Sequence, residues 1–204
     1  VRHAEAEHNG FHSPRHVFDP VLKPAGWKQV EQLRKHIVAT GLMREVKLVV
    51  VSPLTRTLQT AVGLFGVRHG SERISSPSPL VALDLCRELM IPSGATKRRP
   101  ISESKFQFPE VDFSQIEDDE DVLWKPNRES RESFDARRTS FLQWLTFREE
   151  KNIAVVSHGA FLKNLVNSRD DDGSSFCGDQ KTSNFSNCEL FSIALHLKPS
   201  SSLC

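Results

Sequence analysis

Two short segments of the chain are rich in β-branched and other apolar residues, 46–52 (VKLVVVS) and 152–157 (NIAVVS). A parallel strand that is covered by helices on both faces has such a near-continuous apolar run. We therefore predict that both segments are central strands of a mainly parallel sheet. Further strands are predicted at 80–85 and, near the end of the chain, at 188–197.

Apolar residues recur at helical spacing in four other segments. Two of these, 54–65 and 160–166, directly follow the two central strands. The other two, 24–40 and 134–148, each combine an apolar face with a charged one. Strands that alternate with helices predict an α/β fold of three layers, α/β/α, with right-handed crossovers.

The length of 204 residues fits one large domain of this class, and we assign 1–204 to it. The pattern breaks at 89–133, where prolines, serines and an acidic run at 117–121 replace any apolar period. We predict that this segment is an irregular insertion decorating the sheet, with its acidic side chains in solvent. Its basic triplet 97–99 (KRR) either contacts an anionic substrate or faces solvent. Another polar loop is predicted at 168–184.

Charge and composition exclude several classes of protein. Lys and Arg number 27 against 26 Asp and Glu, so the chain lacks the basic excess of proteins that bind long nucleic acids. No apolar run approaches the ~18 residues that a membrane-spanning helix needs. The four cysteines are widely spaced and form no CxxC pair, which favours an intracellular, cytoplasmic location. A targeting peptide ahead of Val1 and any oligomeric state are compatible with the sequence.

Histidines and arginines stand at the expected ends of three strands. Arg2-His3 lies where we expect a further strand to end, and 52–56 (SPLTR) and 157–159 (SHG) follow the two central strands. The carboxyl ends of parallel strands meet at one edge of a sheet, where α/β proteins bind ligands. Arginine matches phosphate oxygens in pairs, and a helix N-terminus adds backbone N–H groups. The sequence therefore predicts a phosphate-binding pocket with few acidic neighbours.

The same residues, in this order, resemble the motifs of the histidine phosphatase superfamily, the phosphoglycerate mutase-like proteins. Segment 1–9 (VRHAEAEHN) is similar to the first motif, Arg-His-Gly-Glu with an Asn six positions after the His. Segments 52–61 (SPLTRTLQTA) and 157–159 are similar to the second and third. Ala4 replaces the family's Gly, and we expect its methyl group to be tolerated. Segment 108–126 further resembles a plant and fungal branch of these proteins.

This resemblance implies a phosphatase that hydrolyses a phosphate monoester through a phosphohistidine on His3. The nucleophile must be a neutral imidazole, which neighbouring arginines favour. His158 is expected to be both catalytic and phosphate-binding. The residues expected to hold the phosphate are Arg2, Asn9, Arg56 and His158. For Asn9 the alternative role is to orient the loop.

A general acid must also protonate the leaving oxygen. The family places a glutamate just after the strand predicted at 80–85, so Glu88 is our assignment and Asp84 the alternative. A carboxyl group that faces a bound dianion has its pKa raised and can deliver this proton. The resemblance implies no metal and no other cofactor. It implies a small phosphorylated substrate, whose place free phosphate or sulfate would occupy, without indicating which molecule it is.

Three alternatives accompany this interpretation. A phosphoglycerate mutase would return the phosphoryl group to a second hydroxyl, and a non-catalytic member would bind a phosphorylated ligand without turnover. The third is a metal site, because four histidines recur at short spacing. Gly10 and Pro14 disfavour the helix that would align them. The four are His3, His8, His12 and His16.

Overall fold

The computed structural model of the chain describes residues 1–10, 17–66, 78–167 and 184–195. All but the last residue of the loop predicted at 168–184 lies outside these ranges. No helix within them has the length and apolar character needed to cross a membrane.

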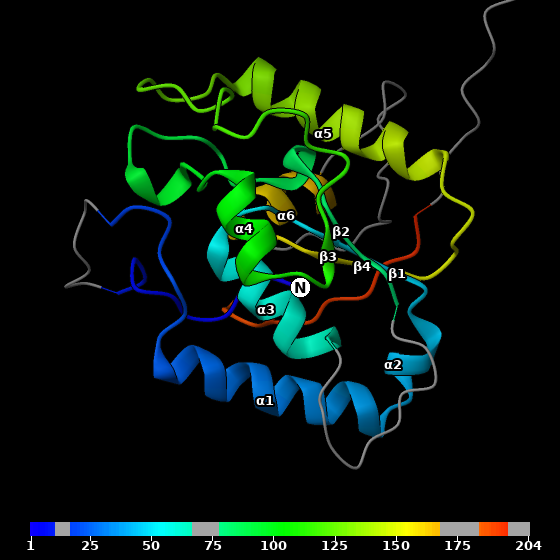
Figure 1. The fold of residues 1–204 in the computed structure, drawn as a ribbon. Coiled ribbons are helices and arrows are strands. Elements are labelled where there is room, and N and C mark those ends of the chain that lie inside the picture. Colours follow the sequence, from blue (N-terminus) through cyan, green and yellow to red (C-terminus); the bar gives the residue numbers. More distant parts are fainter. Residues whose placement is uncertain (11–16, 67–77, 168–183, 196–204) are drawn as a thin grey trace, which may run out of the picture.

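The predicted parallel sheet is confirmed. Four strands are all parallel and lie in the order β3-β2-β1-β4, so the first strand in sequence is central (Figure 1). Every residue of the central strand is buried, as its continuous apolar pattern requires. The strands are β1 (Leu48–Val51), β2 (Leu80–Ala82), β3 (Val111–Asp112) and β4 (Ile153–Val156).

Strand register brings three chain segments to the same edge of the sheet. β1 and β4 end level, because Val51 pairs with Val156. Ser157 then forms an isolated parallel bridge with Arg2, and the His3 N–H donates to the Ser157 carbonyl over 2.9 Å. Arg2-His3 therefore lies beside the end of β4, as the sequence predicts.

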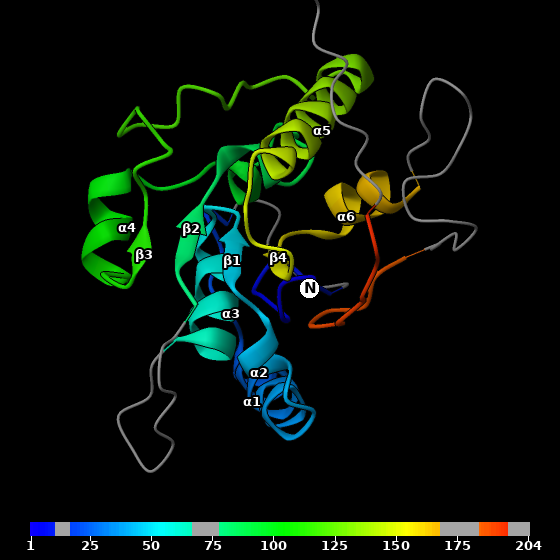
Figure 2. The same cartoon turned by 90° about the vertical axis from the view of Figure 1, so that its right-hand side faces the viewer.

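Helices cover both faces of the sheet, which confirms the three-layer architecture. Alternate residues of β1 face opposite sides: Val49 and Val51 pack in one apolar cluster, and Leu48 and Val50 in the other. The first cluster lies against α1 and α3, and the second against α5 and α6, as Figure 2 shows. The helices are α1 (Pro24–Ala39), α2 (Leu42–Glu45), α3 (Thr55–Phe65), α4 (Ile101–Gln107), α5 (Arg131–Thr146) and α6 (Gly159–Val166).

Several element boundaries differ from the predictions by a few residues, and two of them have a local reason. Helix α5 begins three residues before the predicted 134, because the Ser130 side chain accepts a hydrogen bond from the Ser133 N–H and caps the helix. The strand predicted at 80–85 ends at Ala82. The chain there enters a 3₁₀ turn, in which the Arg87 N–H donates to the Asp84 carbonyl.

The strand predicted at 188–197 is wrong for the residues described, since 188–195 form no strand. Cys188 has a φ of 59°, in the left-handed region that interrupts an extended chain. Its N–H instead donates to the carbonyls of Arg2 and His3, at 3.1 and 3.2 Å. Segment 188–195 therefore supports the first motif through these backbone hydrogen bonds and does not join the sheet.

The insertion is more ordered than predicted. It contributes α4 and the edge strand β3, which pairs with β2. Its polar sequence folds around buried charge, because Arg98 is only 2% exposed and donates to the carbonyls of Asp118, Asp119 and Glu120. A core built around a buried arginine produces no periodic pattern of apolar residues, so the sequence pattern could not predict it.

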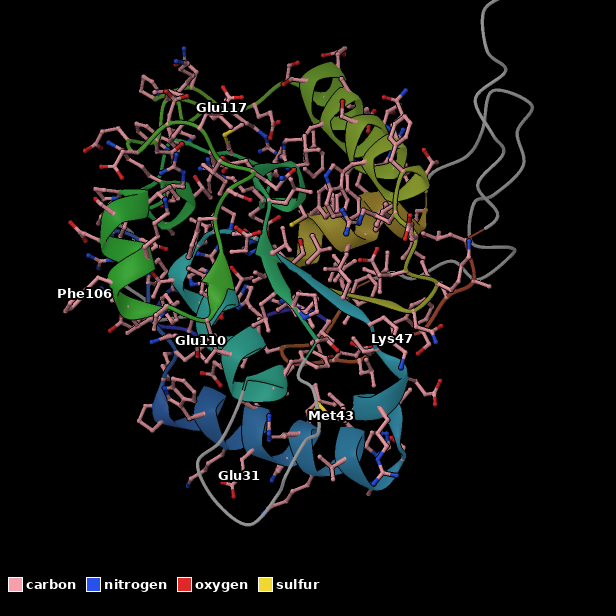
Figure 3. All side chains as sticks on the ribbon, turned by 45° about the vertical axis from the view of Figure 1, so that its right-hand side comes forward. Glu31, Met43, Lys47, Phe106, Glu110 and Glu117 are labelled. Carbon is pink, nitrogen blue, oxygen red and sulfur yellow. The ribbon has the colours of Figure 1, made fainter. Side chains whose placement is uncertain are left out.

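Two expectations about the charges of this insertion are corrected. Arg98 of the basic triplet does not face solvent, because it is buried and donates to backbone carbonyls of the acidic run. In the acidic run, Glu117 lies at the outer surface as predicted (Figure 3). Asp121 is buried and pairs with Arg87, with Nη2 and Oδ2 2.7 Å apart.

Candidate active site

His3 lies buried at the carboxyl edge of the sheet, with 1% of its surface exposed. Its Nδ1 is 2.8 Å from the Ala4 carbonyl oxygen. A carbonyl oxygen only accepts, so Nδ1 carries the proton and Nε2 keeps its lone pair. Burial, followed by the charge of Arg56, holds the pKa of His3 well below its usual value. His3 is therefore a neutral imidazole with Nε2 as its basic atom.

Arg56 comes from the first turn of α3 and is 1% exposed. Its Nη1 donates to the Ala95 carbonyl over 2.9 Å, and its Nη2 lies 3.1 Å from Nδ1 of His158. Among the described residues no carboxylate forms an ion pair with it, and its buried Nε has no hydrogen-bond partner. Burial lowers its pKa to about 10. The charges of Asp19 and Glu88 act on this buried guanidinium from beyond ion-pair distance, so none of the described residues neutralises it directly.

His158 stands at the N-cap of α6, with its ring centroid 5.2 Å from that of His3. Its Nδ1 accepts from Arg56, so the proton of the neutral ring is on Nε2, which donates to the Ser52 hydroxyl over 2.8 Å. Burial, followed by Arg56, lowers its pKa well below the usual value. The residue lies beside His3 as predicted, but the protein holds both of its nitrogens. In this arrangement His158 orients Arg56.

Arg2 lies against the first residue of α6. A Cβ built on Gly159 would be 3.5 Å from Nε of Arg2, so the guanidinium rests on the helix N-terminus. Its Nη1 donates to the Phe185 carbonyl over 2.5 Å, and its buried Nε has no partner among the described residues. Burial lowers its pKa, against the opposing charges of Glu88 and Glu189.

Glu88 and Asp84 occupy different surroundings, which separates the two candidate acids. The Glu88 carboxylate accepts the Leu89 N–H over 3.0 Å and also the Phe161 N–H in the first turn of α6. Burial raises its pKa, while Arg56 and Arg2 partly oppose that rise. Oδ1 of Asp84 instead lies 3.2 Å from Nη1 of Arg87, on the side of the insertion. Glu88 is thus the carboxyl group close to the arginines that flank His3.

Asn9 holds the loop that carries His3. Its Oδ1 accepts from the Ala6 N–H at 3.0 Å and from Nδ2 of Asn187 at 3.3 Å. Asn187 Nδ2 also donates to the His3 carbonyl over 3.1 Å. Of the polar atoms in the Asn9 side chain, only Nδ2 faces another group of the site, the ring of His8.

Two residues that sequence reasoning did not assign to the site lie within it. Asp19 is 1% exposed, and its carboxylate accepts the Thr55 N–H at 2.9 Å and the Thr55 hydroxyl at 2.6 Å. It thereby fixes the first turn of α3, which presents Arg56. His8 was considered only as a metal ligand, yet its ring lies 5.5 Å from that of His3. Neither residue carries a local signal, because their partners are distant in sequence or defined by the turn.

The alternative of a metal site at the four histidines can be tested only in part. His12 and His16 lie outside the described residues. Within the described ranges, no three histidine, cysteine or carboxylate side chains are grouped as metal ligands. His3 and His8 instead face a cationic surrounding, which opposes the binding of a metal cation.

The arrangement combines three chemical features. His3 offers a basic nitrogen, Arg2 and Arg56 supply two positive charges, and Glu88 supplies a carboxyl group whose pKa burial raises. The charges of Glu88, Asp19 and Glu189 act on these arginines. Among the described residues, however, no carboxylate forms an ion pair with either guanidinium, and the buried Nε of each has no partner, so the site is suited to an anion. A phosphate dianion would satisfy the open guanidinium nitrogens and face the basic nitrogen at the same time.

Comparison with known proteins gives the same picture. Residues 1–190 match the family described as the histidine phosphatase superfamily (branch 1). A phosphoglycerate mutase-like protein of Arabidopsis thaliana is 41% identical over 227 residues, covering 96% of this chain and 82% of that protein. Phosphoglycerate mutase-like protein 1 of the same plant is 38% identical over 224 residues, covering 96% and 79%.

Solved structures share the fold. The alpha-ribazole phosphatase from Shigella flexneri superposes with a TM-score of 0.53 at 22% identity, covering 81% of this chain and 75% of that one. A putative alpha-ribazole-5'-P phosphatase from Escherichia coli gives a TM-score of 0.53 at 20% identity, with the same coverage. The family match spans the motifs that build the site, and the chain therefore belongs to the histidine phosphatase superfamily (branch 1).

Proposed function

We propose that the protein is a metal-independent phosphatase, which hydrolyses a small phosphate monoester through a phosphohistidine on His3. One observation carries the proposal: the Ala4 carbonyl fixes the proton of His3 on Nδ1, so Nε2 keeps its lone pair in a ring on which the charges of two guanidiniums, Arg56 and Arg2, act. A phosphoryl group is the electrophile that suits both features. Arginine stabilises the charge on its oxygens, and the imidazole nitrogen attacks its phosphorus.

In the first step, Nε2 of His3 attacks phosphorus and the P–O bond to the leaving group breaks. Glu88, whose pKa burial raises, gives its proton to the leaving oxygen as that bond breaks. Arg2 and Arg56 balance the charge on the transferring group. Nδ1 of His3 keeps its proton and continues to donate it to the Ala4 carbonyl while Nε2 carries the phosphoryl group.

In the second step, water attacks the phosphoryl group and its proton passes to the Glu88 carboxylate. The P–N bond breaks, inorganic phosphate leaves, and His3 and Glu88 recover their starting protonation. The same carboxyl group therefore acts as acid and then as base. His158 is a positioning residue in this scheme, because it binds Arg56.

Phosphoglycerate mutase chemistry is a second candidate, favoured by the names of the Arabidopsis relatives. It shares the first step and differs in the acceptor, which is a second hydroxyl in place of water. The ordered insertion next to Arg56 would have to exclude water for that outcome. We favour the phosphatase.

A phosphoenzyme assay tests the proposal. The wild type and His3→Ala are mixed with ³²P-labelled monoesters from a metabolite panel, and the protein is recovered under alkaline conditions. We expect label on the wild type that is stable to base and lost in acid, no label on His3→Ala, and release of inorganic phosphate. His36→Ala, at an exposed position of α1, is the matched control and should label normally.

The same assay distinguishes the alternatives. Transfer of label to a second hydroxyl of a diol acceptor, without inorganic phosphate, would replace the phosphatase by a mutase. Phosphate binding without label and without turnover on any substrate would show a non-catalytic member, and the proposal would be abandoned.

A further inference from the structure

His8 is a second imidazole beside the nucleophile, and the proposed reaction gives it no role. Its ring centroid lies 5.5 Å from that of His3, and the two ring planes are inclined by 40°. A tight turn sets this position, because the Asn9 N–H donates to the Ala6 carbonyl over 2.8 Å. Asn9, which follows His8 in the sequence, therefore helps to fix the position of the His8 ring.

Asn9 determines which nitrogen of His8 carries the proton. The amide oxygen of Asn9 already accepts from the Ala6 N–H and from Asn187, so the amide nitrogen is the atom that faces His8. This Nδ2 lies 3.4 Å from Nε2 of His8. Because an amide N–H can only donate, Nε2 of His8 is the acceptor, and the proton of the neutral ring is on Nδ1.

The ring is neutral because of its surroundings. Burial is the largest cause, and the charges of Arg56, Arg2 and Lys23 add to it, so that the pKa of His8 falls to about 3. At any pH above that value the ring offers a single N–H donor. Arg56 and Arg2, which help to keep the His8 ring neutral, are also the two arginines that act on His3.

The donor nitrogen of His8 forms no hydrogen bond with the part of the protein that the structure describes. Its Nδ1 is buried and has no hydrogen-bond partner among the described residues. The other two imidazoles differ, since the N–H of His3 binds the Ala4 carbonyl and that of His158 binds Ser52. A buried donor without a partner is destabilising, and a bound ligand can supply the missing acceptor.

We propose that His8 is a substrate-binding residue, whose Nδ1–H donates a hydrogen bond to a non-bridging oxygen of the phosphoryl group that faces His3. This proposal rests on the proposed function for the identity of the ligand, but it requires only that phosphate binds. The arginines supply charge, and His8 adds a directed neutral donor that does not repel them. An empty site leaves this donor unpaired, and an occupied one satisfies it.

Phosphate affinity tests the proposal with three variants. His8→Phe keeps a flat ring and loses the donor, and His8→Asn puts an amide nitrogen close to where Nδ1 stands. His36→Phe makes the same exchange at an exposed position of α1 and serves as the control. The dissociation constant of inorganic phosphate is measured by titration calorimetry, and the midpoint of thermal unfolding is measured without phosphate.

We expect His8→Phe to weaken phosphate binding at least tenfold, equivalent to about 1.4 kcal/mol. Its unfolding midpoint in the absence of phosphate should equal or exceed that of the wild type, because the unpaired donor is gone. A purely structural histidine would not combine weaker binding with unchanged or higher stability. His8→Asn should stay within about threefold of the wild type, and the control should not change.

Unchanged phosphate affinity in His8→Phe would overturn the inference, even if the wild type forms a phosphoenzyme. Conversely, loss of affinity in His8→Phe supports it, even if the wild type never becomes labelled and the proposed function fails. If His8→Phe does not fold, ¹⁵N NMR of the wild-type histidines decides. A proton on Nδ1 of His8 that moves downfield with phosphate supports the inference, and a proton on Nε2, or no response, overturns it.

Discussion

Two groups of buried or half-buried arginines in this protein are surrounded in opposite ways. The cluster beside His3 contains Arg2 and Arg56, whose pKa values burial lowers. The insertion cluster contains Arg87, which binds Asp121 through two nitrogens at 2.8 and 2.7 Å, and Arg98. Burial also acts to lower the pKa of Arg87, but the bond to Asp121 outweighs it and the pKa is raised.

The carboxylates Glu88 and Asp121 differ in the same way as the arginines beside them. Burial acts to raise the pKa of both Glu88 and Asp121. For Glu88 the rise persists, whereas the hydrogen bond and charge of Arg87 leave the pKa of Asp121 below its usual value. A buried charge that the protein neutralises is structural, and one that it leaves open is suited to a ligand or a proton transfer.

One turn joins the two clusters. The Ala95 carbonyl accepts from Arg56, and the next carbonyl, that of Thr96, accepts from Arg87 over 2.8 Å. The insertion is therefore part of the support for Arg56. The comparison predicts that mutations in the two clusters affect different properties: activity in the first and stability in the second.

The largest expected effect is on catalysis. Arg56→Met should lower kcat/KM by about 10³–10⁵-fold, because an arginine that stabilises a transferring phosphoryl group contributes that much. Its free energy of unfolding should fall by no more than about 1 kcal/mol, since removing an unneutralised buried charge offsets the lost hydrogen bonds. Steady-state kinetics and urea unfolding measure both quantities. A large loss of stability would place Arg56 with the structural arginines.

Replacement of the proposed acid should depend on the leaving group. Glu88→Gln should cost about 10²–10⁴-fold in rate on an alkyl phosphate, whose oxygen must be protonated as it leaves. The loss should shrink with p-nitrophenyl phosphate, because its leaving group is stable as an anion. Asp84→Asn is the matched control, and equal losses of Glu88→Gln on both substrates would remove Glu88 from this role.

The insertion cluster should respond in stability. Arg87→Met leaves Asp121 buried without its cation, which should lower the free energy of unfolding by about 3–5 kcal/mol. Urea unfolding measures the change, and Arg87→Met with Asp121→Leu should recover part of it. If Arg87→Met is as stable as the wild type, the contrast between the clusters is wrong.

A smaller effect concerns pH. Burial and the neighbouring cations lower the pKa of His8 from 6.5 to about 3, so only the unfolded chain gains this proton between those values. Stability should therefore be complete above pH 6.5 and fall as the pH falls below it. Between pH 7 and 5, His8→Asn should lose about 1–2 kcal/mol less than the wild type. Equal losses would show that His8 is protonated in the fold.

Much of the fold could be predicted from the sequence, because its core strands are apolar at nearly every position. Segments 46–52 and 152–157 carry that pattern and became β1 and β4. The insertion could not be predicted in this way, since its order depends on Arg98 and on the ion pair of Asp121 with Arg87. These contacts join residues 20 to 34 positions apart and leave no periodic trace.

The site, too, has a part that the sequence predicts and a part that only the tertiary structure reveals. Arg2, His3, Arg56 and His158 follow strand ends in recognisable motifs, and the structure brings them together. The parts that motifs do not encode depend on tertiary contacts. Asp19 reaches Thr55 across 36 positions, and the proton positions on the three imidazoles follow from which carbonyl, hydroxyl or amide lies opposite each nitrogen.

The central claim is that the open charges around His3 form a binding site for a phosphate dianion, and a crystal structure with tungstate tests it most directly. Tungstate mimics phosphate and its position is unmistakable from anomalous scattering. The account predicts one ordered anion within hydrogen-bond distance of Arg2 and Arg56, with Nε2 of His3 facing its centre. An anion bound at Arg87 and Arg98 instead, or a site at His3 that stays empty at saturating tungstate, would contradict it.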